Sequence, residues 1–270
     1  MNRIIFILTF LFSLNAFSIV GGRTFNSEGS GIHQVKFIRN DEIDGVCSGV
    51  IIGDFTLLTS AHCIETLNHG DINLLSLNDH NYRIETFWIP LEYFKFNNER
   101  IRNQKIYNQE CFNLVTVEDC EKLFDNFNSS YRNTSIFDLG IVNLVESFPG
   151  GLGRLHISYQ IEQNPVELVA FGASKFDEAE KLCTSYGEGA FSRTLSLEIE
   201  AFLDQESIFY VLGRDMLDKV SCPGDSGGTV LQNDWLVGLI SGSLIKGGRV
   251  GTIITPLSRH EEFLRTFVKE

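Results

Sequence analysis

The chain has 270 residues and is acidic, with 22 Lys and Arg against 35 Asp and Glu and a formal net charge of −13. A negative field repels phosphates, so this composition argues against a nucleic-acid-binding protein. The simplest role of the acidity is to keep an exported protein soluble. The length allows one large domain or two modest ones, each with its own core.

Residues 1–18 have the three parts of an export signal. Arg3 gives a positive start, residues 4–12 are apolar, and Ala16-Phe17-Ser18 is a small-x-small cleavage site. The apolar run is too short to cross a hydrocarbon core of about 30 Å. We expect cleavage after Ser18, which would make Ile19 the new N-terminus, or after Ala16, which would leave a dipeptide to be removed.

The chain contains six cysteines, an even number that in an exported protein predicts three disulfides. Zinc binding is the alternative, but neither a Cys-x-x-Cys nor a His-x-x-x-His spacing occurs. We therefore expect no metal site and no cofactor. The pairing of the cysteines remains open on these grounds.

Short apolar runs rich in branched residues recur along the chain, each closed by turn residues. They predict strands of an all-β barrel or sandwich. The segment Pro149-Gly150-Gly151 is the best candidate for a boundary between two halves. The predicted strands lie within residues 46–53, 55–59, 139–142, 167–172 and 235–240.

Residues 97–137 are polar and interrupt this pattern. Cys111 and Cys120 lie nine positions apart within the segment. We expect a long surface excursion pinned by a local disulfide.

The last segment, residues 258–270, predicts one amphipathic helix that packs on the second half of the molecule. Ser258 and Glu261 have the spacing of a capping box. The apolar residues at helical spacing are Phe263, Leu264, Phe267 and Val268.

Three further segments carry residues with chemical potential. His62 follows an apolar strand and precedes Cys63, Asp138 begins another strand, and Ser226 lies in the glycine-rich turn of residues 222–228. Each alone has a plain structural explanation: a core imidazole, a turn carboxylate and a loop hydroxyl. Their combination is more informative than any one of them.

Together with Ile19-Val20-Gly21-Gly22, these segments resemble, in the same order, the chymotrypsin/trypsin family of serine proteases over nearly all of residues 19–270. The resemblance implies two packed six-stranded antiparallel β-barrels, the first to about residue 150 and the second over about 151–257, followed by a C-terminal helix. It also implies a secreted serine endopeptidase that acts on protein or peptide substrates. We expect a monomer with no nucleic-acid partner and no membrane association after signal removal, and a protein inhibitor is a further candidate partner.

The resemblance assigns a role to each residue of the motifs. Ser226 is the nucleophile, His62 takes its proton, and Asp138 holds the other ring nitrogen. The backbone N–H groups of Gly224 and Ser226 form the oxyanion hole.

Two further roles follow from the same resemblance. Asp225 pairs with the ammonium of Ile19 after signal cleavage and thereby orients the Gly224 amide. Ser241 supports Asp138.

The resemblance also suggests disulfide partners. Cys47 and Cys63 match the family's disulfide behind the catalytic His. If Cys111 pairs with Cys120, then Cys183 is left for Cys222.

The sequence departs from the family in its substrate pocket. Val220 stands at the pocket floor, where trypsins carry Asp, so cleavage after Lys or Arg is not expected. Gly242-Ser243 replaces Trp-Gly, which removes an aromatic wall and places a hydroxymethyl group in the pocket. Arg249 lies either at the back wall, where it would favour acidic residues, or on an exposed hairpin tip, which leaves a neutral pocket and which we favour.

The 76 positions between His62 and Asp138 exceed the family's usual gap. We expect the excess, in the region of Cys111 and Cys120, to overhang the active-site cleft. A catalytically silent binding or regulatory module on a protease fold is the alternative function. An α/β-hydrolase esterase is excluded by the motif order, since that class runs Ser, acid, His.

Overall fold

The computed structural model describes residues 23–24, 28–110, 117–162, 166–172, 176–177, 182–183, 193–197, 200–201, 209–212, 221, 224–246 and 249–268. The expected export signal and its cleavage site lie outside these ranges. Within them, no helix combines the length and the apolar character that crossing a membrane requires.

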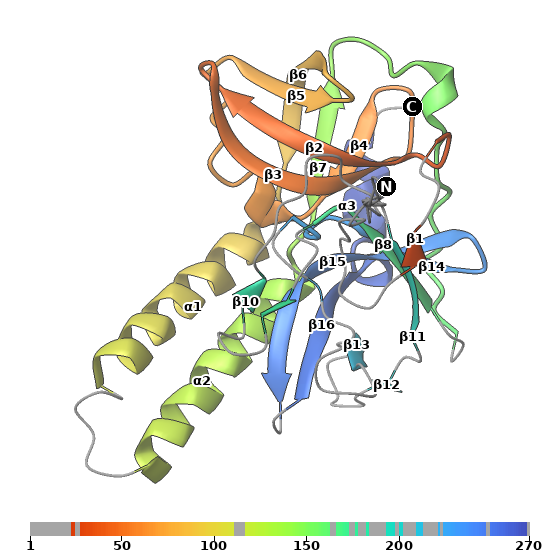
Figure 1. The fold of residues 1–270 in the computed structure, drawn as a ribbon. Helices are drawn as coiled ribbons and strands as arrows, with labels where there is room; N and C mark the ends of the chain where they lie inside the picture. Colours follow the sequence, from red (N-terminus) through yellow and green to blue (C-terminus); the bar gives the residue numbers. More distant parts are fainter. Residues whose placement is uncertain are drawn as a thin grey trace, which may run out of the picture.

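The first half forms a closed antiparallel barrel with strand order β2-β3-β4-β7-β6-β5, at the top of Figure 1. Two of its tight turns are Asn-Asp pairs, Asn40-Asp41 and Asn78-Asp79, whose φ angles lie between 49° and 68°. These two residue types tolerate the left-handed conformation that two-residue hairpin loops require. The strands are β2 (Ile32–Arg39), β3 (Glu42–Ile51), β4 (Thr56–Thr59), β5 (Asn73–Leu77), β6 (His80–Trp88) and β7 (Gly140–Leu144).

The second half is an antiparallel sheet in the order β1-β11-β8-β14-β15-β16-β13-β12. Its six longer strands are β8 (Val166–Ala170), β11 (Arg193–Leu197), β13 (Phe209–Leu212), β14 (Thr229–Gln232), β15 (Trp235–Lys246) and β16 (Arg249–Pro256). The two-residue strands β1 (Arg23–Thr24) and β12 (Glu200–Ala201) form its edges, and β9 (Phe176–Asp177) pairs separately with β10 (Leu182–Cys183).

A single apolar cluster joins the two halves. It combines Leu58 and Ile141 from the barrel with Val169 and Leu239 from the sheet and Leu264 from the C-terminal helix, all buried. Burial of this shared surface fixes the two halves against each other. The predicted mostly β, chymotrypsin-like architecture with a C-terminal helix is confirmed: the first half is the expected closed six-stranded barrel, and the described part of the second half is an antiparallel sheet.

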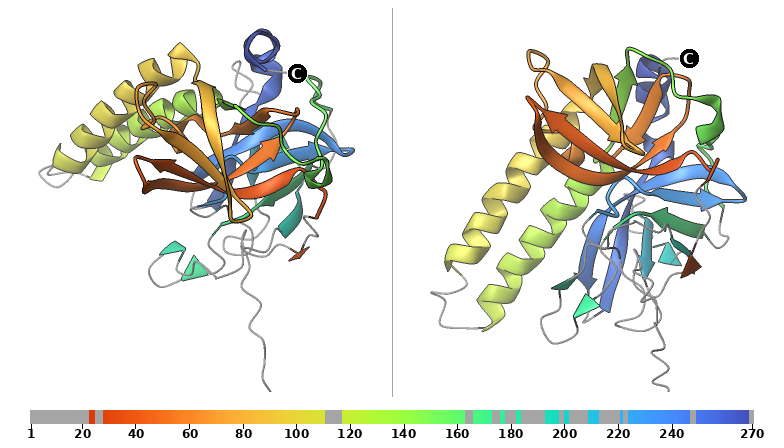
Figure 2. Two further views of the ribbon diagram at one scale, coloured as in Figure 1. Left: turned by 90° about the horizontal axis from the view of Figure 1, so that it is seen from above. Right: turned by 45° about the horizontal axis from the view of Figure 1, so that its top comes forward.

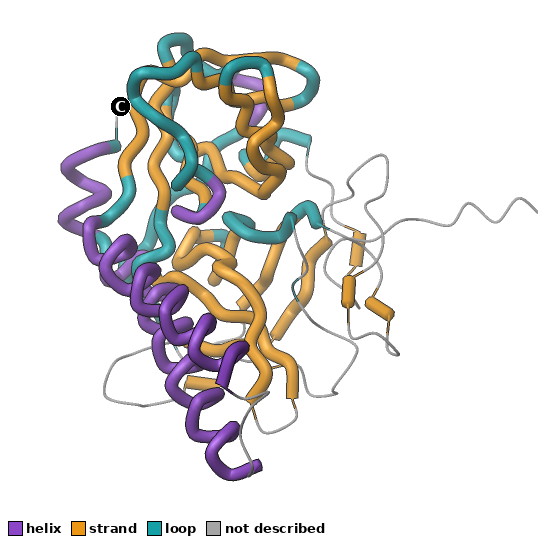
Figure 3. Tube along the Cα trace, turned by 90° about the vertical axis from the view of Figure 1, so that its left-hand side faces the viewer, coloured by secondary structure: helices purple, strands orange, loops and turns teal. Residues whose placement is uncertain are grey.

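The polar segment between β6 and β7, expected as a long surface excursion, forms a helical hairpin. It consists of α1 (Leu91–Glu110) and α2 (Val117–Ile136), each of 20 residues. The two helices pack side by side, and α2 also contacts β15 and β16 (Figures 1 and 2). The sequence did not indicate these helices, because α1 buries only Tyr93 and Asn97 among its described side chains and so has no regular apolar stripe. Figure 3 shows the length of this hairpin from its exposed side.

The C-terminal helix α3 (Glu261–Phe267) follows a short turn η3 (Leu257–Arg259). The expected capping box is wrong, because the helix begins later: His260 is the N-cap and makes no side-chain cap bond. Glu261 instead accepts hydrogen bonds from Arg265, at 2.8 and 3.0 Å. The helix also packs on the first barrel, since the Phe267 ring stacks on Trp88 at 4.3 Å between ring centroids.

Candidate active site

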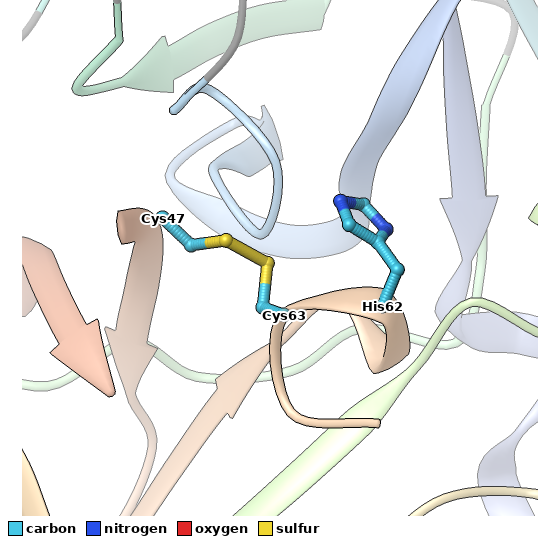
Figure 4. A group of neighbouring side chains, drawn as sticks. All are labelled: Cys47, His62 and Cys63. Atoms are coloured by element: carbon cyan, nitrogen blue, oxygen red, sulfur yellow. A yellow bond between two sulfur atoms is a disulfide. The ribbon is translucent and has the colours of Figure 1, made fainter. Parts of the chain in front are cut away.

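His62 lies in a short 3-10 turn, η1 (Ala61–Cys63), that follows β4. Ala61 and Cys63 are buried on either side of it, while 36% of the His62 side chain is exposed. The predicted disulfide between Cys47 and Cys63 is present and ties this turn to β3. Figure 4 shows the disulfide and the imidazole side by side. The imidazole is therefore presented to solvent from a fixed backbone.

Cys47, His62 and Cys63 also bring three potential metal ligand atoms within 4.8 Å of one another, the one such group in the described part of the chain. Metals bind thiolates, and here both sulfurs are bonded to each other. This group therefore does not offer a metal site.

Asp138 lies two residues before β7 and is buried, with 2% of the residue exposed. Its Oδ1 accepts a hydrogen bond from the backbone N–H of His62 at 3.0 Å. Its Oδ2 lies 2.8 Å from Nδ1 of His62 and accepts a hydrogen bond from Oγ of Ser241 at 2.6 Å. With an acceptor facing Nδ1, the ring carries its proton there and leaves Nε2 as a base.

The charges around His62 set its basicity. Burial lowers the pKa of His62, but the negative charges nearby, first of all the Asp138 carboxylate and its hydrogen bond, raise it, so that the net pKa lies above its ordinary value. Glu65 raises this pKa further and Arg100 lowers it. The pKa of His62 therefore depends on Glu65, close to its own turn, and on Arg100 of α1.

Ser226 lies in the turn before β14, against the His62 segment. Its carbonyl accepts a hydrogen bond from the N–H of Ser48 at 2.8 Å and lies 3.9 Å from Sγ of Cys63. The next residue, Gly227, has φ +79° and donates to the carbonyl of Ile240 at 2.8 Å. The turn is thus held by both halves of the molecule.

The two residues before Ser226 pack tightly against the chain just after β8, at Gly172. Gly224 has φ +95°, and a Cβ there would lie 3.0 Å from Cα of Gly172, so only glycine fits without strain. Asp225 is 0% exposed and packs against Gly172. Its expected partner Ile19 lies outside the described residues, so the activation pair remains a prediction.

Ser48 was not identified from the sequence as a residue of this site. Its Oγ donates to the carbonyl of Gly224 at 2.9 Å and accepts from the N–H of Phe171 at 2.8 Å. Its own carbonyl accepts from Oγ1 of Thr59 at 2.8 Å. In the sequence Ser48 is one hydroxyl within an apolar strand, and nothing local indicates that it joins the barrel to the serine turn.

The structure gives the backbone positions of three of the expected pocket residues, Gly242, Ser243 and Arg249. Gly242 pairs with Ile253 in the β15–β16 ladder, and its carbonyl accepts from Oγ of Ser221 at 2.9 Å. Arg249 pairs with Lys246, four residue pairs further along the ladder, which is about 13 Å at the usual strand rise. Ser243 pairs with Thr252, also on this ladder.

The remaining predicted residues fall where no side chain is described. Val220, Cys111 and Cys222 lie outside the described residues, and the side chains of Cys120 and Cys183 are not described. The second and third predicted disulfides therefore stay predictions.

An aromatic side chain from another element, Tyr131, fills the space beside Gly242. A Cβ on Gly242 would overlap Oη of Tyr131 and lie 3.6 Å from its Cζ. Tyr131 belongs to α2, in the helical hairpin between β6 and β7. The family resemblance could not predict this contact, because none of the motifs that carry it lies in the hairpin.

No protein-family model matches the sequence, and no curated protein is detectably similar to it. Among solved structures, the chain is similar to neuropsin, a serine protease expressed in the limbic system of mouse brain, with a TM-score of 0.56 over 91% of this chain and 97% of that one. The chain has the chymotrypsin-like serine protease fold. At 14% sequence identity this similarity establishes the fold alone.

Proposed function

We propose that the protein is a secreted serine endopeptidase with Ser226 as nucleophile, His62 as general base and Asp138 as the orienting acid. The hydrogen bonds that Asp138 accepts from His62 and Ser241 are the observation that supports it most. A histidine that only fills a core does not need a buried carboxylate aimed at its Nδ1. A general base does, because the carboxylate fixes the tautomer and stabilises the charged ring.

The reaction follows from this arrangement. His62 Nε2 takes the hydroxyl proton of Ser226 as Oγ attacks the substrate carbonyl carbon, and Asp138 stabilises the imidazolium that forms. The same proton passes to the leaving amine, which departs and leaves an acyl-enzyme. Water, deprotonated by His62, then releases the acid and restores Ser226.

The oxyanion that develops in each step needs preorganised donors. The N–H groups of Gly224 and Ser226 are our candidates, each worth about 3–4 kcal/mol in the transition state. The left-handed backbone of Gly224 and the Ser48 hydrogen bond to its carbonyl support this assignment, since both fix the peptide planes of the turn.

Asp225 is proposed to pair with the amine of Ile19 after signal cleavage. A carboxylate with 0% exposure requires charge compensation to remain ionised. Secretion is proposed with it, because the export signal creates the free amine and because a structural disulfide is typical of oxidising compartments.

For substrate choice we propose a neutral pocket lined by Val220 and Ser243, with Arg249 outside it. The position of Arg249 at the end of the β15–β16 ladder supports this alternative. We expect kcat/KM to be lower by orders of magnitude for substrates with Arg than for matched substrates with Ala or Leu at the cleavage position. Preference for Arg would contradict the pocket, and a Glu preference that disappears in Arg249→Ala would place Arg249 inside it.

Covalent labelling distinguishes the proposed protease from the alternative, a catalytically silent binding module. We expect an organophosphate probe to label the secreted wild type on Ser226, and Ser226→Ala to take up none. His62→Ala should slow labelling while leaving the protein folded. A wild type that binds peptides but takes up no label would support the silent module instead.

The charges around His62 predict two opposite shifts in the pH dependence of kcat/KM. Activity needs neutral His62, so it rises as pH increases through the His62 pKa. Glu65→Gln removes a charge that raises this pKa, so the acid limb should move to lower pH; Arg100→Met removes a charge that lowers it, so the limb should move to higher pH. Glutamine keeps the acceptor that Tyr93 and Asn97 use.

Two controls accompany this pH profile. Arg100→Lys keeps the charge, and Glu42→Gln changes an exposed carboxylate at the β2–β3 turn. Neither should move the limb toward the Met or the Gln result. Shifts of the same sign in Glu65→Gln and Arg100→Met would refute the electrostatic explanation.

A further inference from the structure

Gly242 lies on β15 directly beside the proposed catalytic machinery. It follows Ser241, whose hydroxyl donates to Asp138 at 2.6 Å. Its φ does not lie in the left-handed region, so the backbone conformation does not demand glycine here. What demands glycine is space, because Tyr131 occupies the position where a side chain would begin.

The Tyr131 ring is held from both sides within the hairpin. Phe127, one turn earlier on α2, stacks at 6.2 Å between centroids, and the Arg100 guanidinium of α1 lies 6.0 Å from the ring centroid. Arg100 is itself fixed by two hydrogen bonds to Oδ1 of Asn97, at 2.7 and 2.9 Å. The ring therefore has a defined position over β15.

The hairpin is anchored to the same site at two further points. Asn97 and Tyr93 of α1 donate to Glu65, three residues after His62, at 2.9 and 2.7 Å. At the end of α2, the carbonyl of Ser135 accepts from Oγ1 of Thr255 on β16 at 2.7 Å. The hairpin is thus fixed to the segment that carries His62 and to the strand beside β15.

Tyr131 presents a neutral phenol to this region. Burial raises its pKa, the nearby negative charge of Asp138 raises it further, and Arg100 offsets part of this, giving a pKa of about 12. The hydroxyl therefore keeps its proton throughout the range in which His62 titrates.

We propose that Tyr131 is a specificity-determining residue: the helical hairpin supplies the wall of the substrate groove beside Gly242 and limits the size of the substrate side chain that lies there. The proposal rests on the proposed protease function. On this proposal, a peptide bound at Ser226 and His62 extends along β15 past Ser241 and reaches Gly242, where the Tyr131 side chain bounds the available space. The class of substrate favoured at that position is one with a small uncharged side chain.

The test is a comparison of peptide-library cleavage by the wild type, Tyr131→Ala and Tyr107→Ala. Tyr107 is on α1, and its ring also stacks on Phe127, at 6.2 Å, so it controls for loss of an aromatic residue in the hairpin. We expect Tyr131→Ala to raise kcat/KM for Phe or Leu relative to Ala at one substrate position by tenfold or more. Tyr107→Ala should leave that ratio within twofold of the wild type.

A second pair of variants moves the ring to the strand. Gly242→Tyr alone should lower kcat/KM at least tenfold, because its side chain and Tyr131 compete for one space. In the double variant that combines Tyr131→Ala with Gly242→Tyr, most of that loss should be recovered, and the preference for small side chains should return.

The outcomes separate this inference from the function on which it rests. A wild type that cleaves no library peptide would refute the proposed protease function and this role with it. A wild type that cleaves, with a preference that Tyr131→Ala leaves unchanged or that Tyr107→Ala alters equally, would refute the role of Tyr131 alone. Additive losses in the double variant would also overturn it.

Discussion

Asp138→Asn is expected to lower kcat about 10⁴-fold while leaving the fold intact, which corresponds to about 5.4 kcal/mol of lost transition-state stabilisation. The reason lies in how the two carboxylate oxygens of Asp138 are used. Oδ1 accepts from the backbone N–H of His62, a donor that cannot be reversed. The amide nitrogen of the substituted side chain must therefore replace Oδ2, where it faces Nδ1 of His62.

An amide donor at that position changes the tautomer of the imidazole. His62 would accept at Nδ1 and carry its proton on Nε2, so it could not take a proton from Ser226. Oγ of Ser241, which now donates to Oδ2, can rotate and accept from the new amide, so the fold loses little. The defect is in the chemistry, and Tm should change by only a few degrees.

The measurement is kcat of wild type and Asp138→Asn on one peptide substrate, with thermal unfolding of both. Asp79→Asn is a matched control, because Asp79 lies in the exposed β5–β6 turn at φ +62°, a conformation that Asn adopts as readily. Activity within tenfold of wild type in Asp138→Asn would remove Asp138 from the proposed mechanism.

The sequence predicted the part of the site that lies in short local segments. His62 follows a strand, Asp138 precedes one and Ser241 lies within one, and the order of these segments along the chain carries the resemblance. The structure brings these three together through the ladder between β4 and β7 and the packing of β15 on the barrel. The Cys47–Cys63 disulfide was expected from the same resemblance and is present.

The residues that escaped prediction act through contacts distant in sequence. Ser48 meets Gly224 across 176 positions, and no periodicity signals such a pair. Tyr131 lies on α2, whose partner α1 has no regular apolar stripe, and the sequence analysis did not predict the hairpin. In the sequence, Gly242 indicated only a missing aromatic side chain, because its contact with Tyr131 is distant along the chain.

Gly227→Ala is expected to destabilise the protein by about 3–5 kcal/mol, near the upper end of single substitutions, and to abolish activity. Gly227 follows Ser226 directly and has φ +79°, a conformation that strains any residue with a Cβ. The added methyl would overlap the carbonyl oxygen of Ser48 and Oγ1 of Thr59, and it would lie 2.9 Å from the backbone nitrogen of Ser60.

None of these neighbours can move away without loss. Thr59 and Ser48 are hydrogen-bonded to each other at 2.8 Å, and both are buried in the closed barrel. Relief would require the serine turn to withdraw from the barrel. That withdrawal would break the bonds from Ser48 to the carbonyls of Ser226 and Gly224 and separate Ser226 from His62.

Thermal unfolding and organophosphate labelling measure both effects, with Gly70→Ala as the matched control. Gly70 has no atom within 4 Å of its added Cβ and no left-handed φ, so its change in stability should stay within about 0.5 kcal/mol. A loss of about 3–5 kcal/mol should lower Tm by about 10 °C in a chain of this size. If Gly227→Ala unfolded at the wild-type temperature and kept its label, Ser226 would not depend on the contact between the serine turn and the barrel. The proposed coupling of the two halves at the nucleophile would then be wrong.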